Sequence, residues 1–371
     1  MKKIIFCAMA LSTGMLALAQ TNTSNAHMMG NSNTATVDQT GLNHLSNLDI
    51  NGSTNTIDID QVNRDNDSDV DIVLSDWNTV TVNQDGRDLE SKVLITGPGS
   101  DNTATVTQTG RFNTSDIMQD GSENKATVTQ SDGGYFFFFP VPNKSEIKQL
   151  FNSDYNEATV TQSGKAQLSL IDQSGDSNIA EVTQSHGANN SNIDQSGDSN
   201  TTTITQSNLF NESTVNQSGD GNTATVNQSL GVNFFSIANR SDINQSGNTN
   251  TATVTQQQGF NQSWIVQQGD GATATVLQNG GLHESDIFQN SGSPDMASVT
   301  QYGLNQTSDI DQMGVGLHNA SVIQSGANHY SMVMQSGSGH SSTVTQSGGG
   351  HHSTVTQVGM NNTATVTQSG F

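Results

Sequence analysis

Apolar and polar residues alternate along most of the chain in short runs with a period of two. Two runs make one unit, and both have the form small residue, x, aliphatic, x, glutamine, as at 191–195 and 202–206. Alternation of this kind, with β-branched residues, predicts two strands whose named side chains share one face. Gly197 and Asn200 stand between the runs and are typical of a tight reversal.

This strand–turn–strand unit recurs with a spacing close to 22 residues. The glutamines that end the second runs are Gln39, Gln61, Gln84, Gln108, Gln130, Gln162, Gln184, Gln206, Gln228, Gln256, Gln278, Gln301, Gln324, Gln346 and Gln368. Self-similarity at this period indicates stacked repeats. We therefore predict an all-β solenoid of about fifteen rungs in two parallel, in-register sheets, about 70 Å long at roughly 4.8 Å per rung.

Stacking in register would place each inward amide next to its own copies above and below. Such ladders satisfy buried amides that an isolated rung could not satisfy. In the first runs, Met28, Ile50, Ile72 and Ile95 stand where glutamine stands from Gln119 onward. The residues predicted to form the structural ladders and their turns are Gln173, Gln184, Gln195, Gln206, Gln217, Gln228, Gln245, Gln256, Asn178, Asn200, Asn222, Asn250, Gly175, Gly197, Gly219 and Gly247.

The amino-acid composition, taken alone, favours a disordered chain over a folded solenoid. Of the 371 residues 31% are hydrophobic and 12% are charged, and the formal net charge is −23, values typical of a disordered polar chain. The periodicity outweighs them, although a disordered secreted matrix polymer stays open as an alternative. The acidic balance argues against binding of nucleic acid or anionic lipid.

The first 19 residues have the form of a secretory signal peptide. Lys2 and Lys3 precede an apolar stretch, which ends at the small-residue cleavage site 17–19. Cleavage there would remove Cys7, the single cysteine, so no disulfide is expected. We assign 1–19 as signal peptide, 20–23 as a short N-terminal segment and 24–371 as repeats, with insertions near 131–144 and 229–240. No later segment is apolar enough to span a membrane.

One repeat, residues 241–256, reads SDINQSGNTNTATVTQ. This motif resembles the curlin repeat of the subunits of curli, the amyloid fibres of bacterial biofilms. The resemblance implies export through the periplasm and a dedicated outer-membrane channel, assembly started by a nucleating subunit, and roles in cell adhesion and the extracellular matrix. Whether this chain would be the major subunit or the nucleator stays open.

Repeat strands run close to both ends of the sequence, at Ser24 and at 365–368, without an evident cap. We therefore expect copies to polymerise end to end. A cap formed by the degenerate first rungs is the alternative. The acidic stretch 58–76 and the prolines at 98, 140, 142 and 294 would act as gatekeepers against premature aggregation.

Outward acids that stack on neighbouring rungs would repel by about 1 kcal/mol per pair in water. The pairs expected to do so are Asp69 with Asp71 and Asp172 with Asp194. Acid or divalent cations should therefore speed assembly.

The outward positions of the second runs are rich in threonine, as at 103–107 and 201–205. A flat threonine array is also typical of ice-binding solenoids, so a monomeric adhesin or ice-binding protein is an alternative function. Threonine also simply favours exposed strand positions, and Lys125, Glu181 and Leu277 interrupt the array.

Hydrophobic residues recur in the second arc of several units and are expected to approximate a stripe along one edge. They are Leu42, Phe112, Phe210, Phe260, Leu282 and Leu304. The aromatic insertion 133–142, with Phe136, Phe137, Phe138 and Phe139, would either protrude or lie on the solenoid. Phe112, Phe210, Phe260 and the insertion are candidates for adhesion or fibre bundling.

No motif indicates catalysis, a cofactor or a metal site. The adjacent His351 and His352 would point to opposite faces of a strand and could not chelate together. We therefore expect a non-enzymatic protein.

Overall fold

The computed structural model describes residues 21–136, 139–150, 153–229 and 238–370. The described residues form strands joined by turns and short arcs, and no helix occurs among them. The first sheet contains β1 (Thr23–Met29), β3 (Leu45–Asn51), β5 (Asp67–Val73), β7 (Glu90–Thr96), β9 (Thr114–Asp120), β12 (Lys144–Leu150), β14 (Leu168–Ser174), β16 (Asn190–Ser196), β18 (Glu212–Ser218), β20 (Arg240–Ser246), β22 (Gln262–Gln267), β24 (Glu284–Ser291), β26 (Thr307–Gly316), β28 (Tyr330–Ser338) and β30 (His352–Met360).

The second sheet alternates with the first along the chain. It contains β2 (Thr34–Leu42), β4 (Thr56–Arg64), β6 (Thr79–Arg87), β8 (Thr103–Arg111), β10 (Lys125–Phe136), β13 (Glu157–Lys165), β15 (Ile179–Gly187), β17 (Thr201–Ser207), β19 (Thr223–Ser229), β21 (Thr251–Gln257), β23 (Thr273–Gly281), β25 (Met296–Leu304), β27 (Asn319–Ala327), β29 (Ser341–Gly349) and β31 (Thr363–Gly370). The short strand β11 (Phe139–Val141) pairs with β10 alone.

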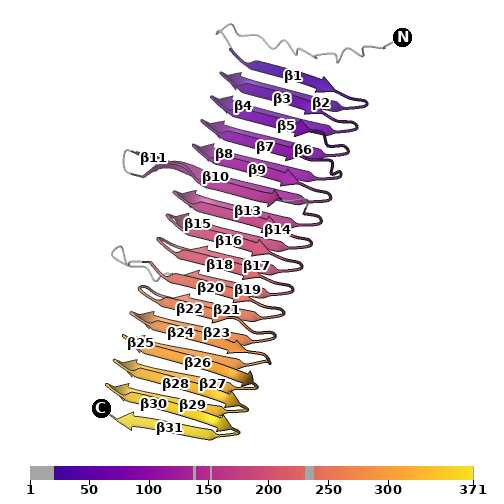
Figure 1. The fold of residues 1–371 in the computed structure, drawn as a ribbon. Coiled ribbons are helices and arrows are strands. Elements are labelled where there is room, and N and C mark those ends of the chain that lie inside the picture. Colours follow the sequence, from indigo (N-terminus) through magenta and orange to yellow (C-terminus); the bar gives the residue numbers. More distant parts are fainter. Residues whose placement is uncertain (1–20, 137–138, 151–152, 230–237, 371) are drawn as a thin grey trace.

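Each rung is one strand of the first sheet followed by one strand of the second, and rungs stack from one end of the molecule to the other (Figure 1). Stacked strands run parallel, and equivalent residues face each other, as Gln195 of β16 faces Gln217 of β18. The predicted all-β solenoid with two parallel, in-register sheets is confirmed. A disordered polymer is not compatible with this fold.

The interior is a thin layer between the two sheets. Within each strand burial alternates with a period of two, so that serine or alanine, an aliphatic residue and glutamine point inward. Ile193, Val215 and Ile243 stack in one fully buried column, and Ile204, Val226 and Val254 stack in the facing one. Burial of these branched side chains provides the apolar part of the core.

The first arc of each rung reverses the chain through two residues with positive φ. Gly197 has a φ of 96° and Ser199, directly before Asn200, has a φ of 60°. A Cβ on Gly197 would lie 2.4 Å from the carbonyl oxygen of Gly219 on the next rung. Glycine is therefore required both by the backbone conformation and by the close approach of the next rung.

The aromatic insertion extends a rung without breaking the stack. β10 pairs in parallel with β8 and β13, and then forms an antiparallel hairpin with β11, in which Phe136 faces Phe139. The hairpin projects beyond the edge of the stack (Figure 1). Residues 1–20, 137–138 and 230–237, which include the predicted signal peptide and most of the second insertion, lie outside the described residues.

Candidate functional site

The contacts between successive rungs are the candidate functional site, because they recur from the first to the last described rung. In the second sheet, the inward glutamines form one hydrogen-bonded ladder. Gln184 Nε2 donates to Gln206 Oε1 at 2.8 Å, and Gln206 Nε2 donates to Gln228 Oε1 at 2.9 Å. The same bond joins each pair of neighbours from Gln39 to Gln368, and its donor always belongs to the lower-numbered rung.

Each ladder amide also bonds across the interior. Gln206 Nε2 donates its second hydrogen to the carbonyl of Asn190 in β16, at 2.9 Å, and Gln228 Nε2 does the same to Glu212 in β18. Both hydrogens of the amide are therefore used, one along the stack and one across it. This satisfies a fully buried polar group without water.

The first sheet carries the second glutamine ladder, which includes Gln173, Gln195, Gln217 and Gln245. It begins at Gln119, because Ile95 occupies the equivalent position on the preceding rung. Gln119 Oε1 is consequently buried without a hydrogen-bond partner. One interruption of the ladder therefore leaves one buried acceptor without a hydrogen-bond donor.

Asparagines of the first arc form a third ladder. The backbone N–H of Asn200 donates to Asn178 Oδ1 at 2.9 Å, and Asn222 and Asn250 continue the series at 3.0 and 2.9 Å. Asn200 Nδ2 donates to the carbonyl of Gly219 on the next rung at 2.7 Å. The predicted turn residues are therefore inter-rung contacts as well, and they link glycine and asparagine of neighbouring units.

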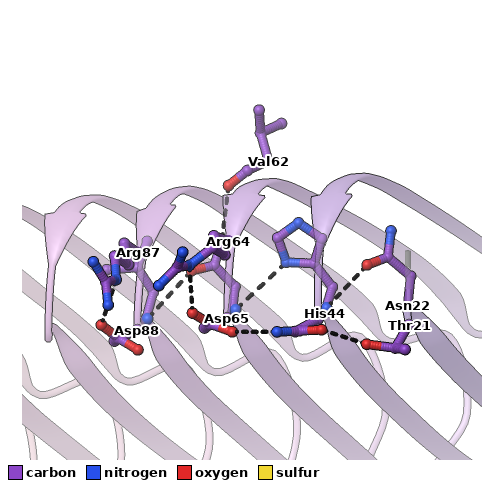
Figure 2. A network of polar contacts seen from close by, with 11 residues as sticks. Thr21, Asn22, His44, Val62, Arg64, Asp65, Arg87 and Asp88 are labelled. Carbon is purple, nitrogen blue, oxygen red and sulfur yellow. Dashed lines mark hydrogen bonds and ion pairs between the residues drawn. The ribbon is translucent and has the colours of Figure 1, made fainter. Parts of the chain in front are cut away.

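A fourth ladder, which the sequence pattern did not predict, runs along the second arcs. The backbone N–H of Asn211 donates to Asn189 Oδ1 at 3.1 Å, and Asn211 Nδ2 bonds the carbonyl of Ser207. Histidine replaces asparagine here in some rungs. Figure 2 shows His44, whose N–H donates to Asn22 Oδ1 and whose Nδ1 accepts the N–H of Asn66 at 3.4 Å.

The repeat that contains these ladder residues was also compared with models of known protein families. The model of the curlin associated repeat matches residues 99–131, 154–185, 197–229, 269–303, 319–348 and 343–370. Each matched segment contains ladder glutamines. The chain belongs to the curlin-repeat family. No curated protein matches it.

The outer surface of the first sheet of this curlin-repeat chain carries stacked carboxylates. Asp172 lies next to Asp194 on the following rung, and burial first, then the Asp194 charge, raises the pKa of Asp172. The expected pairing of Asp69 with Asp71 is wrong, because both lie on β5; Asp71 instead stacks on Asp49. Burial, together with Asp311 and Asp286, raises the pKa of Asp309 to about 6.

Threonines stack on the outer surface of the second sheet. Thr105, Thr127 and Thr159 follow one another in register, and Glu181 then interrupts the column before Thr203. In a neighbouring column, Lys125 forms an ion pair with Glu157 at 2.6 Å. The array is therefore interrupted, as its sequence indicated.

The hydrophobic residues of the second arcs fall into two neighbouring columns, in which polar residues alternate with them. Leu42 stacks on Arg64, and the column continues through Arg87 and Arg111. Phe112 follows Arg111 and belongs to the neighbouring column, which contains Asp65 and Asp88 in the preceding rungs. Phe210 and Phe260 have φ near 65° in their arcs and are 47% and 36% exposed.

The ion pairs of Arg64 with Asp65 and of Arg87 with Asp88 lie in these two columns (Figure 2). The edge therefore mixes charged and aromatic residues. Among the described residues, no cluster of side chains could hold a metal ion, and no helix is long and apolar enough to cross a membrane.

Proposed function

We propose that this chain is a secreted structural subunit of extracellular, curli-like amyloid fibres and that its copies stack end to end. The observation that carries the proposal is the uniformity of the inter-rung contacts. The in-register strand pairing and the glutamine ladder of the second sheet join every pair of neighbouring rungs among the described residues, and the other three ladders join most of these pairs. A rung of a second copy offers this same set of partners, so joining two copies needs no new chemistry.

The last described strand supports this proposal. β31 has one partner, β29, among the described strands, and its inward residues Ala364, Val366 and Gln368 are only partly buried, whereas the equivalent Val344 is fully buried. A stacked rung would bury these side chains and pair the free backbone groups of the edge. Unpaired strand edges of this kind template further strands.

In this proposal, the route of export, the partners and the biological role are inferred from membership of the curlin-repeat family. The fibres would form outside the cell, after passage through an outer-membrane channel and with a nucleating subunit. They would contribute to the biofilm matrix and to adhesion, with the β10–β11 hairpin, Phe112, Phe210 and Phe260 as candidate contact points. The competing function is a solenoid that remains monomeric, as an adhesin or an ice-binding protein.

Electron microscopy and fibre diffraction of the purified chain test the proposal directly. We expect fibres with a meridional reflection near 4.8 Å and an equatorial one near 10 Å, and faster growth when preformed fibres are added as seeds. A chain that stays monomeric at high concentration with seeds present would favour the monomeric alternative. Thermal hysteresis of that monomer would then assign ice binding.

A matched pair of variants tests the stacking edge. Val366→Lys places a charge on the inward face of β31, where solvent reaches it in one copy but a stacked rung would bury it. Thr365→Lys places the same charge on the outward face of the same strand. We expect Val366→Lys to slow elongation at least about tenfold and Thr365→Lys to change it little. Equal rates for both variants would contradict end-to-end stacking through this edge.

A further inference from the structure

Histidines replace the ladder asparagines in the C-terminal rungs. His318 and His340 lie in successive first arcs, and their rings stack with centroids 5.1 Å apart. His329 and His351 lie in successive second arcs and stack with centroids 5.2 Å apart. His318, His329 and His340 are at most 2% exposed.

The hydrogen bonds of these histidines fix their protonation state. The backbone N–H of His340 donates to His318 Nδ1 at 3.3 Å, and the N–H of Asn362 donates to His340 Nδ1 at 3.2 Å. In the other column the N–H of His351 donates to His329 Nδ1 at 3.3 Å. An Nδ1 that accepts from a backbone N–H carries no hydrogen.

The opposite ring nitrogen must then be the donor. Nε2 of His340 lies 3.1 Å from the carbonyl of Ser336, and Nε2 of His329 lies 3.0 Å from that of Ser325. Each ring is therefore a neutral imidazole that closes its own arc through Nε2–H and holds the next rung through Nδ1. Asn189 makes the same two kinds of bond with an amide that does not titrate, because its Nδ2 donates to the carbonyl of Ser185 and its Oδ1 accepts the backbone N–H of Asn211.

We propose that these histidine ladders are an acid-sensitive lock, which holds the C-terminal rungs closed while the imidazoles are neutral and opens their arcs when they are protonated. A proton on Nδ1 would point at a backbone N–H, so the inter-rung bond is lost. It would also place two positive rings about 5 Å apart in a buried column. The lock works within one chain and does not depend on polymerisation.

Few charges surround the lock. The sequence contains no Asp, Glu, Lys or Arg from Gln312 to Phe371, and the carboxylates just before this stretch, Asp309 and Asp311, point outward from β26. Asp295 precedes His318 in the first-arc column, and its Oδ1 accepts the N–H of His318 at 2.9 Å. The second-arc column has the neutral Gln306 before His329. The other titratable rings nearby, Tyr330 and His352, stack on each other on the outer face.

The position of Asp295 decides which residues to test. Its carboxylate can stabilise a charge on His318, whereas His329 and His340 have no such neighbour. His283, earlier in the second-arc column, serves as an internal comparison. Burial lowers the pKa of His283 from about 6.5 to about 4, so the open state of its rung binds the proton more readily and its rung should also open more at pH 5.

Hydrogen exchange of the full chain, followed by mass spectrometry at pH 7.5 and pH 5.0 and corrected for intrinsic exchange rates, tests the lock. We expect opening of residues 328–350 to increase at least about tenfold at pH 5.0, while residues 190–228 change much less. The double variant His329→Asn with His340→Asn should abolish the increase. His352→Asn, on the outer face, should leave it intact.

Equal protection of residues 328–350 at both pH values would overturn the proposal. So would an acid response that persists in the double asparagine variant. If that variant does not fold at pH 7.5, the reverse change decides the question. Asn200→His, placed in a rung with an asparagine ladder, should make residues around 200 acid-sensitive, and an unchanged acid response there would refute the mechanism.

Discussion

Replacing one ladder glutamine by leucine tests whether the amide ladder behaves as a chain of donors and acceptors. In Gln206→Leu, two inter-rung bonds disappear, from Gln184 and to Gln228. Gln184 Nε2 retains the carbonyl of Leu168 and Ser191 Oγ, so it keeps partners. Gln228 Oε1, in contrast, becomes a buried acceptor without a donor, as Gln119 Oε1 already is.

An orphaned buried acceptor costs about 1–3 kcal/mol, and each lost bond about 1 kcal/mol, partly offset by the greater burial of apolar leucine. We therefore expect Gln206→Leu to lower the local opening free energy by about 2–3 kcal/mol. Adding Gln228→Leu moves the orphan to Gln256 Oε1 but does not add one. The double variant should thus cost about as much as either single variant, instead of about 5 kcal/mol for independent sites.

Native-state hydrogen exchange of β17 and β19 measures the three opening free energies and closes the double-mutant cycle. A control pair of leucines on rungs far apart, Gln206→Leu with Gln324→Leu, should be additive, because each then creates its own orphan. Additive costs for the neighbouring pair as well would refute the reasoning, since the ladder would then be a set of independent contacts.

Three further substitutions have expected outcomes in thermal or urea unfolding. Gly219→Ala should destabilise by at least about 2 kcal/mol, because φ is 101° and a Cβ would lie 2.3 Å from the carbonyl oxygen of Gly247. Gly292→Ala, with nothing within 4 Å of the added Cβ, should be nearly neutral. Ser241→Ala should be neutral or stabilise by up to about 1 kcal/mol, because Ser241 Oγ is buried without a partner. Asp309 binds a proton in the folded chain below a pKa of about 6 but in the unfolded chain only near 3.9, so folded stability should rise as pH falls between these values. Asp309→Asn should remove that dependence and stabilise the chain at pH 7 by about 1 kcal/mol, after a discount for its partial exposure; a pH-independent difference between the two chains would contradict this.

Much of the fold could be predicted because the determining signal is periodic. A spacing close to 22 residues and an alternation of two specify which side chains point inward and which residues face each other on neighbouring rungs. The pairing of Gln195 with Gln217 follows from those two numbers alone. The glutamine and first-arc asparagine columns of the structure are therefore the ones that the sequence indicated.

The arcs were less predictable, because their columns depend on single-residue differences that no alternation reports. Leu42 and Phe112 both stand in a second arc, yet Leu42 belongs to the arginine column and Phe112 to the column of Asp88. The spacing of the second-arc asparagines in the sequence does indicate their ladder. Asn189 and Asn211 are 22 residues apart, and each stands two residues before an inward serine.

The carboxylates show a different limit. Burial raises the pKa of Asp71, and the charges of Asp69 on the same strand and of Asp49, 22 residues away on the preceding rung, raise it further. In a solenoid, an outward carboxylate therefore faces charges two residues away on its own strand and charges one repeat away on the next rung. The pKa of Asp309 depends likewise on burial, on Asp311 of its own strand and on Asp286 of the preceding rung, and only Asp311 is visible in its local sequence.

The polar interior resolves the conflict between composition and fold. A buried amide is costly unless all its hydrogen-bonding groups are satisfied, and one rung cannot satisfy them. In the stack, Gln206 finds a donor above, an acceptor below and a carbonyl across the interior. A slip of one residue would turn these amides outward and bury threonines in their place, so the amides specify register while the aliphatic columns supply burial. A sequence with few apolar residues can therefore have one ordered structure, provided that its polar side chains recur at equivalent positions of every rung.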